Sequence, residues 1–130
     1  MPHHLSTALI VDDNSYIRRA LCSFIESHTV IDGCSEAADG LEAVEKSKQQ
    51  KPVLVLLDLS MPNMNGVEAA GIIRKLLPNA RIVVFTIHST VKSLVGADVV
   101  VCKEEGSAGL LAALHSLFPD SFFQVSSVPN

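Results

Sequence analysis

The sequence has little that would attract nucleic acid or a membrane. Ten lysines and arginines stand against fourteen aspartates and glutamates, which makes the formal net charge −4 at pH 7. That balance offers no basic footprint for nucleic-acid phosphates. No apolar run approaches the roughly 20 residues of a membrane span, and the first residues lack the apolar stretch of a signal peptide. We therefore expect a cytoplasmic protein that binds neither nucleic acid nor membranes directly.

Cysteine is also scarce, and histidine is scattered. The three cysteines, Cys22, Cys34 and Cys102, cannot all pair, and each lies in an apolar stretch. A reduced thiol there behaves as a small hydrophobic group, so the sequence indicates no redox role. The five histidines show no close pair with a matching second pair, which argues against a structural zinc site.

The chain does have enough apolar residues for one folded domain. It has 130 residues, of which 48% are hydrophobic. Four short runs are apolar at every position: 8–11, 53–57, 82–85 and 99–102. Strands have this pattern when both faces of a parallel sheet are covered. A weaker stretch, Thr29 to Cys34, is interpreted as an edge strand.

Segments with helical spacing alternate with these runs. The first follows Asn14 or Ser15 as cap, the second carries the i,i+4 pair Glu42 and Lys46, and the third, from Gly66, ends before Pro78. The last is predicted from Ser107 as cap to Phe118. The order is a βα unit repeated five times, which predicts a doubly wound α/β fold with a five-stranded parallel sheet.

Polar residues follow these strands at the edge where such folds place their chemistry. They are Asp12, Asp13, Asp58, Thr86 and Lys103. Strands often end in one polar residue at the solvent boundary, but five together are harder to explain that way. Carboxylates about 4 Å apart repel by roughly 4 kcal/mol at a surface-like dielectric, so this cluster favours a divalent cation.

Oxygen ligands alone select Mg²⁺ or a similar hard ion such as Mn²⁺, and Mg²⁺ readily accepts a phosphate oxygen. The cluster therefore indicates phosphoryl chemistry. We assign Asp58 as phosphoryl acceptor, Asp12 and Asp13 as metal-holding residues, and Lys103 and Thr86 as contacts to the phosphoryl oxygens.

From Ala8 to Phe118 the sequence resembles the receiver domain of two-component response regulators. The most specific motifs are Val11 to Asn14 and Asp58 to Gly66, supported by residues 38–43 and by Gly96-Ala97-Asp98 before Lys103. The resemblance implies a flavodoxin-like fold with strand order 2-1-3-4-5. It divides the chain into a tail at 1–7, the receiver domain at 8–118 and a tail or linker at 119–130.

The resemblance also implies a function. Asp58 would accept a phosphoryl group from a sensor histidine kinase or a phosphotransfer protein, with Mg²⁺ required. Asp13 and Asp58 would bind the metal by side chain, Ser60 by its carbonyl and Asp12 largely through water. Pro62 would keep the preceding residue out of helical geometry, and Gly66 would begin the next helix without a clash.

Several positions depart from the family pattern. Val100 stands where the family usually has the aromatic residue that reports phosphorylation. Lys103 comes only 17 positions after Thr86, so the fourth helix, with its candidate at 89–95, is predicted to be short or missing. Ile87 replaces a small residue and narrows access to the acceptor, whereas Ser60 and His88 occupy positions that tune how water reaches the acyl phosphate.

Alternatives remain open at this point. The chain is predicted not to be an enzyme beyond self-catalysed phosphoryl acceptance and slow hydrolysis, because an aspartate phosphatase needs a second carboxylate where Ser60 stands. A phosphorylation-insensitive scaffold is the main rival. A partly exposed apolar face on residues 89–118 would suit homodimerisation. Arg18 and Arg19 are either docking charges or a solvated helix face. Residues 119–130 are a disordered tail, a linker or a segment docked by Phe122 and Phe123.

Overall fold

The computed structural model describes residues 6–59, 64–87 and 93–124. Within these residues, one parallel sheet contains five strands in the order β2-β1-β3-β4-β5, as predicted. The strands are β1 (Thr7–Val11), β2 (Gly33–Ala37), β3 (Leu54–Leu57), β4 (Arg81–Thr86) and β5 (Val99–Cys102). The helices are α1 (Ser15–His28), α2 (Gly40–Gln50), α3 (Gly66–Leu76) and α4 (Gly106–Leu117).

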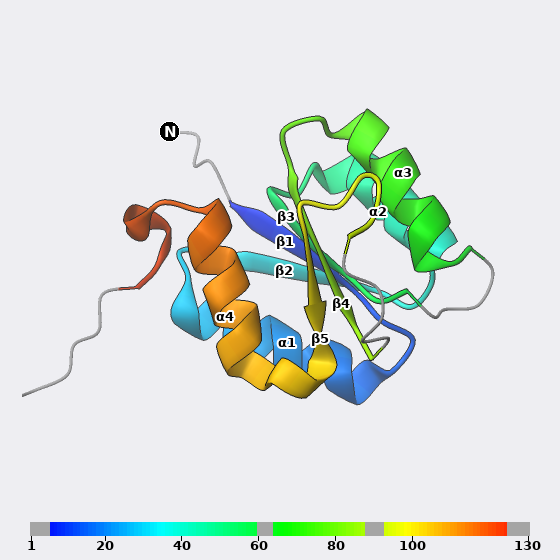
Figure 1. Ribbon diagram of the computed structural model, residues 1–130. Coiled ribbons are helices and arrows are strands. Elements are labelled where there is room, and N and C mark those ends of the chain that lie inside the picture. Colours follow the sequence, from blue (N-terminus) through cyan, green and yellow to red (C-terminus); the bar gives the residue numbers. More distant parts are fainter. Residues whose placement is uncertain (1–5, 60–63, 88–92, 125–130) are drawn as a thin grey trace, which may run out of the picture.

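The helices cover both faces of the sheet, as Figure 1 shows. Ala8 and Ile10 of β1 pack with residues of α1 and α4, whereas Leu9 and Val11 pack with residues of α2 and α3. Successive side chains of a strand point to opposite faces, so a strand between two helical layers must be apolar at every position. This explains the continuous apolar runs of β1, β3 and β4.

The edge strand lies further along the chain than Thr29 to Cys34, so its predicted position was wrong. Helix α1 continues to His28, and β2 begins only at Gly33, which pairs with Thr7 of β1. Residues 30–32 bring the chain back to the start of the sheet, and Ile31 fills the core there at 3% exposure. The apolar residues Val30 and Ile31 therefore suggested a strand where there is none, whereas the edge strand β2 is more polar.

The start of α1 and the end of α3 follow local signals in the sequence. Asn14 caps α1, its Oδ1 accepting from the backbone N–H groups of Tyr16 at 2.9 Å and Ile17 at 3.1 Å. Helix α3 ends at Leu76, two residues before Pro78. The predicted cap of the last helix, Ser107, was wrong, because α4 begins at Gly106 directly after a 3₁₀ turn at Lys103–Glu105.

The connection from β4 to β5 contains no helix in its described part, residues 93–98. Its chain passes through a turn in which Gly96 has a φ of +97°, a conformation that favours glycine. The short or missing fourth helix is thus confirmed for these residues, whereas positions 89–92 of its candidate lie outside the described part.

The segment after α4 packs back against the end of α1. Phe122 is 8% exposed and stacks on Phe118 with ring centroids 3.8 Å apart. The carbonyl of Phe122 accepts from the N–H of Val30 at 2.8 Å, and the N–H of Gln124 donates to the carbonyl of His28 at 3.0 Å. Among the three alternatives for this region, the structure supports a docked segment for residues 119–124.

Candidate functional site

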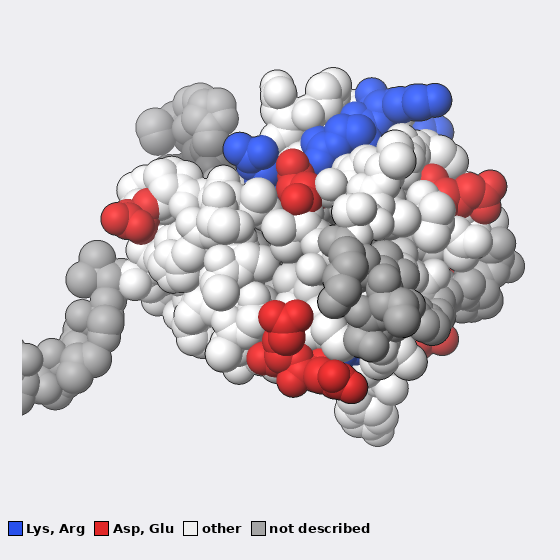
Figure 2. Space-filling view, in the orientation of Figure 1, with Lys and Arg blue, Asp and Glu red and all other residues white. Residues whose placement is uncertain are grey.

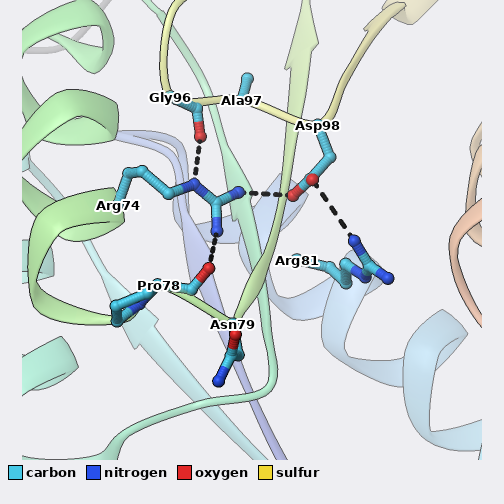
Figure 3. A pocket seen from close by; sticks show the side chains of 7 residues that line it. All are labelled: Arg74, Pro78, Asn79, Arg81, Gly96, Ala97 and Asp98. Atoms are coloured by element: carbon cyan, nitrogen blue, oxygen red, sulfur yellow. Dashed lines mark hydrogen bonds and ion pairs between the residues drawn. The ribbon is translucent and has the colours of Figure 1, made fainter.

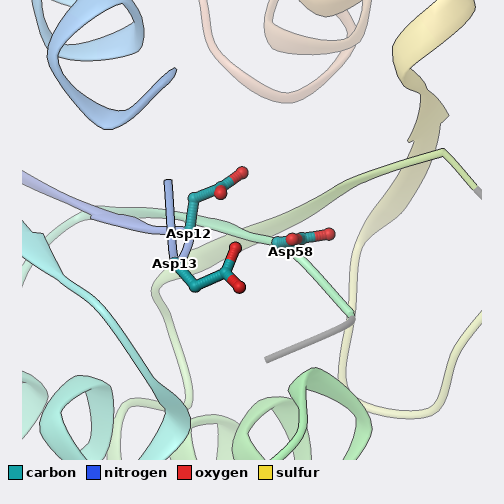
Figure 4. A group of neighbouring side chains, drawn as sticks. All are labelled: Asp12, Asp13 and Asp58. Atoms are coloured by element: carbon teal, nitrogen blue, oxygen red, sulfur yellow. The ribbon is translucent and has the colours of Figure 1, made fainter. Parts of the chain in front are cut away.

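Three carboxylates meet at the carboxyl edge of the sheet. Asp12 and Asp13 follow β1, and Asp58 follows the neighbouring strand β3. One oxygen of each lies within 4.8 Å of those of the other two, and Figure 4 shows the side chains gathered in one place. Asp12 is 2% and Asp58 7% exposed, whereas Asp13 is exposed. The predicted acidic cluster is therefore present, with two buried carboxylates and one that is exposed to solvent.

Strand pairing positions these carboxylates. Val11 of β1 lies opposite Leu57 of β3, so the next residue of each strand is an aspartate. The N–H of Asp58 donates to the carbonyl of Val11 at 2.9 Å, which extends the ladder by one bond. Beyond Asp12, the N–H of Asn14 donates to Oδ1 of Asp12 at 2.9 Å and turns the chain into α1. The geometry at the edge thus follows directly from the parallel register.

The ammonium group of Lys103 lies beside the carboxylates, as the sequence predicts. It follows β5, and its Nζ lies 2.9 Å from Oδ2 of Asp12 and 3.9 Å from Oδ2 of Asp58. The side chain is 18% exposed, so its charge acts in a partly dehydrated setting. Among its described residues, this cluster contains three carboxylates and one ammonium. Its net charge is therefore negative, which favours binding of a further cation.

All donors in this cluster are oxygens, which is the chemistry that Mg²⁺ and Mn²⁺ prefer. No histidine or cysteine joins Asp12, Asp13 and Asp58 in the group of described residues able to hold a metal. The residues present therefore fit a hard divalent cation. Ser60, whose carbonyl was predicted as a ligand, lies outside the described residues, as do Pro62 and His88.

The remaining predicted positions that the structure describes lie at the end of β4, on β5 and at the start of α3. Thr86 ends β4 and is fully buried, whereas Ile87 is 66% exposed. Val100, at the predicted switch position, is partly buried on β5 opposite Val84. Gly66 packs so tightly on the carbonyl of Asp58 that a Cβ would overlap it. Glycine at this position therefore lets α3 begin directly beneath the candidate acceptor.

Arg18 is a residue of the site that sequence reasoning did not assign. Its Nη1 donates to the carbonyl of Asp12 at 2.7 Å, and its Nε donates to Oε1 of Glu36 at 2.9 Å. The side chain is only 16% exposed, so it is neither a solvated charge nor free for docking. Glu36 lies outside the edge strand predicted from the sequence, so the sequence carried no signal for this pairing.

A second charged cluster lies at the opposite, amino edge of the sheet. Figure 2 shows basic side chains gathered along the upper edge and acidic ones at the lower edge, where β5 ends. A pocket of about 470 Å³ at the amino edge is lined by Arg74, Arg81 and Asp98, as Figure 3 shows. Oδ2 of Asp98 accepts from Nη2 of Arg74 at 2.6 Å and from the N–H of Ile82 at 2.8 Å.

The polar groups of this second cluster are committed to the protein itself. Arg74 also donates to the carbonyls of Gly96 at 3.0 Å and Ala80 at 2.6 Å. These bonds tie the end of α3 to the loops on both sides of β4. The Gly96-Ala97-Asp98 motif therefore has a structural explanation.

Comparison with known proteins agrees with this geometry. A family model described as "Response regulator receiver domain" matches residues 8–115. The chain is 34% identical over 115 residues to the nitrate/nitrite response regulator protein NarL of Escherichia coli, covering 85% of this chain and 53% of that protein. It is 40% identical over 78 residues to the response regulator protein VraR of Staphylococcus saprophyticus, covering 60% of this chain and 37% of VraR.

Solved structures give the same result. The response regulator TrrA of Thermotoga maritima, in complex with Mg²⁺ and beryllium fluoride, matches with a TM-score of 0.77 and 31% identity, covering 87% of this chain and 99% of that chain. CheY in a CheX-CheY-BeF₃-Mg²⁺ complex from Borrelia burgdorferi matches with a TM-score of 0.77 and 30% identity, covering 87% and 89%.

The curated relatives are longer than this chain, which spans about half of NarL and just over a third of VraR. No helix in the described part is long and apolar enough to cross a bilayer. The strand order, the acidic cluster and the family match agree with one another. The chain belongs to the response regulator receiver domains, the regulatory modules of two-component signalling.

Proposed function

We propose that this domain accepts a phosphoryl group on Asp58 from a phosphohistidine of a sensor histidine kinase or a phosphotransfer protein. The observation that carries the proposal is the meeting of Asp12, Asp13 and Asp58 within 4.8 Å beside the Lys103 ammonium. A carboxylate is a weak nucleophile, so it accepts a phosphoryl group only where positive charge offsets the negative oxygens around it.

The phosphoryl transfer forms one bond and breaks one bond. A carboxylate oxygen of Asp58 forms the new bond to phosphorus, the phosphorus–nitrogen bond to the donor histidine breaks, and the imidazole keeps the electron pair and takes up a proton. Lys103 stabilises the negative phosphoryl oxygens, and the hydroxyl of Thr86 donates a hydrogen bond to one of them. Slow hydrolysis of the acyl phosphate restores Asp58, with access of water set by Ser60, Ile87 and His88.

Mg²⁺ is part of this proposal. Asp13 and Asp58 would hold it by their side chains, the carbonyl of Ser60 would complete the protein ligands, and Asp12 would act largely through water. When bound, the cation neutralises charge on the transferred phosphoryl group. The oxygen-only donor set and the similarity to structures described with Mg²⁺ and beryllium fluoride support this assignment.

The test is phosphorylation by acetyl phosphate followed by intact mass measurement. With Mg²⁺ we expect one phosphoryl adduct on the wild-type chain, and none with Asp58→Asn or when a chelator replaces Mg²⁺. Asp32→Asn, an exposed aspartate away from the cluster, is the matched control and keeps the adduct. An adduct that persists in Asp58→Asn would falsify the assignment of the acceptor.

A second candidate is a phosphorylation-insensitive scaffold that dimerises or binds a partner regardless of Asp58. Val100 at the switch position and the non-helical connection at 93–98 favour it, because both lie where the family pattern would transmit a signal. Analytical ultracentrifugation with and without beryllium fluoride separates the candidates. Equal dimerisation in both conditions supports the scaffold, whereas a shift on addition supports phosphorylation-dependent switching.

A further inference from the structure

Two cysteines meet where α1 packs on the edge strand β2. The Sγ atoms of Cys22 on α1 and Cys34 on β2 lie 2.6 Å apart, and no disulfide bond joins them. Cys22 is 8% exposed, whereas Cys34 is partly exposed. The third cysteine, Cys102, ends β5 at the opposite edge of the sheet. The fold therefore selects one pair out of three thiols that the sequence left unpaired.

Both sulfurs are held by regular structure rather than by loops. One turn before Cys22 on the same helix, Arg18 forms its ion pair with Glu36, which lies two residues beyond Cys34 on β2. Residues four apart on a helix share a face, and so do residues two apart on a strand. The ion pair and the two thiols therefore lie side by side between α1 and β2, and the ion pair helps to keep the two sulfurs facing each other.

We propose that Cys22 and Cys34 are a modification site, a dithiol that hydrogen peroxide converts into an intramolecular disulfide linking α1 to β2. In the first step, the thiolate of Cys22 attacks one peroxide oxygen, the O–O bond breaks, and the released hydroxide takes up a proton to become water. Cys22 is then a sulfenic acid.

In the second step, Cys34 loses its proton and its sulfur attacks the sulfur of Cys22. The S–O bond breaks and the hydroxide leaves as a second water. Two thiols are oxidised to one disulfide, and one peroxide is reduced to two waters. The proposal does not depend on phosphoryl transfer, and its test uses no phosphoryl donor.

The environment identifies Cys22 as the attacking sulfur. The thiol of Cys34 donates a hydrogen bond to Cys22, and this bond lowers the pKa of Cys22 although burial opposes the shift. The negative charges of Glu36 and Glu26 also oppose the lower pKa of Cys22, and the positive charge of Arg18 favours it to a smaller extent. The same hydrogen bond raises the pKa of Cys34, so that thiol gives up its proton only as it attacks. Thiolates, not thiols, react with peroxides.

The experiment treats the full chain with hydrogen peroxide, blocks free thiols with N-ethylmaleimide under denaturing conditions, and measures the intact mass. The reduced chain should take up three maleimides, one for each cysteine, and the oxidised chain one, on Cys102. Glu26 lies between the paired cysteines, so cleavage after glutamate should leave the Cys22 and Cys34 peptides joined until a reductant separates them.

Variants and denaturant make the test specific. After peroxide treatment, Cys102→Ser should have neither the Cys22 nor the Cys34 thiol available to maleimide. In Cys34→Ser, Cys22 should remain a free thiol or be oxidised to a sulfinic acid. Oxidation in concentrated urea should yield mixed pairings that include Cys102, because only the folded chain selects this pair. Three maleimides on the peroxide-treated native chain, or a native disulfide through Cys102, would overturn the proposal.

Discussion

The two edges of the sheet use aspartates and cations in opposite ways. At the amino edge, Asp98 faces the two guanidinium groups of Arg74 and Arg81 and a backbone N–H. At the carboxyl edge, Asp12, Asp13 and Asp58 share the single ammonium of Lys103 among the described residues of that cluster. The shortest ion-pair distances are similar, 2.6 Å for Arg74–Asp98 and 2.9 Å for Lys103–Asp12.

Charge balance, rather than ion-pair distance, distinguishes the two edges. The amino edge is satisfied within the chain, so it holds α3 against the loops that flank β4. Among the described residues, the acidic cluster at the carboxyl edge has more carboxylates than cations, an imbalance that destabilises the protein by itself but favours binding of a divalent cation. The following changes test this contrast.

Replacing Lys103 with Met should give the largest effect. Loss of a fixed charge at the phosphoryl oxygens should reduce the rate of phosphorylation by acetyl phosphate about 100-fold. The affinity for Mg²⁺ should rise, because the pocket becomes more negative. Isothermal titration with Mg²⁺ and the rate of adduct formation measure the two effects separately, with the exposed Lys75→Met as control. A parallel fall in both quantities would contradict the assignment.

Replacing Asp98 with Ala should act on stability alone. The change leaves the N–H of Ile82 and one side of Arg74 without their acceptor, which should cost about 2 to 3 kcal/mol in the free energy of unfolding. Equilibrium unfolding in urea measures it, with the exposed Asp32→Ala as control. Phosphorylation of the folded fraction should be unchanged, and a specific loss of it would show that the two edges are coupled.

Replacing Arg18 with Gln should weaken the acidic cluster indirectly. Arg18 holds the carbonyl of Asp12, and groups that orient metal-binding residues typically contribute about tenfold to metal affinity. We expect a loss of that size in Mg²⁺ affinity. The neighbouring Arg19→Gln, on the exposed side of α1, should change nothing. Equal affinities in the two variants would make Arg18 a structural residue only.

The smallest effect concerns Glu42 on the surface of α2. The N–H of Ala38 donates to its carboxylate at 2.7 Å, and this bond lowers the pKa of Glu42 below its usual 4.5. Its ion pair with Lys46 adds about 0.3 to 0.5 kcal/mol. Because the pKa is lower in the folded state, this stability is present above pH 4.5 and is lost as the pH falls through the folded value.

Thermal unfolding of Glu42→Gln measures this dependence. The variant should be slightly less stable than the wild type at neutral pH and equal to it at pH values below the folded pKa of Glu42. A stability difference between Glu42→Gln and the wild type that does not change with pH would show that the effect does not come from the charge of Glu42.

Much of the fold follows from patterns that the sequence carries locally. The apolar runs of β1, β3, β4 and β5 and the end of α3 before Pro78 were predicted and are confirmed, and of the two caps considered for α1, Asn14 or Ser15, the structure has Asn14. The start of α4 was not, because a 3₁₀ turn after Lys103 replaces the cap expected at Ser107. Strand β2 was misplaced because its partner β1, and not its own hydrophobicity, determines where it begins.

The sequence by itself determined that polar groups would follow buried parallel strands, because a strand covered on both faces must be apolar until it leaves the core. It thereby determined the acidic cluster and its lysine. Only the tertiary structure decided which residues meet across elements: Arg18 with the carbonyl of Asp12, Asp98 with Arg74, and Cys22 with Cys34. Such contacts depend on how a helix is rotated against a strand, and packing sets that rotation over the whole core.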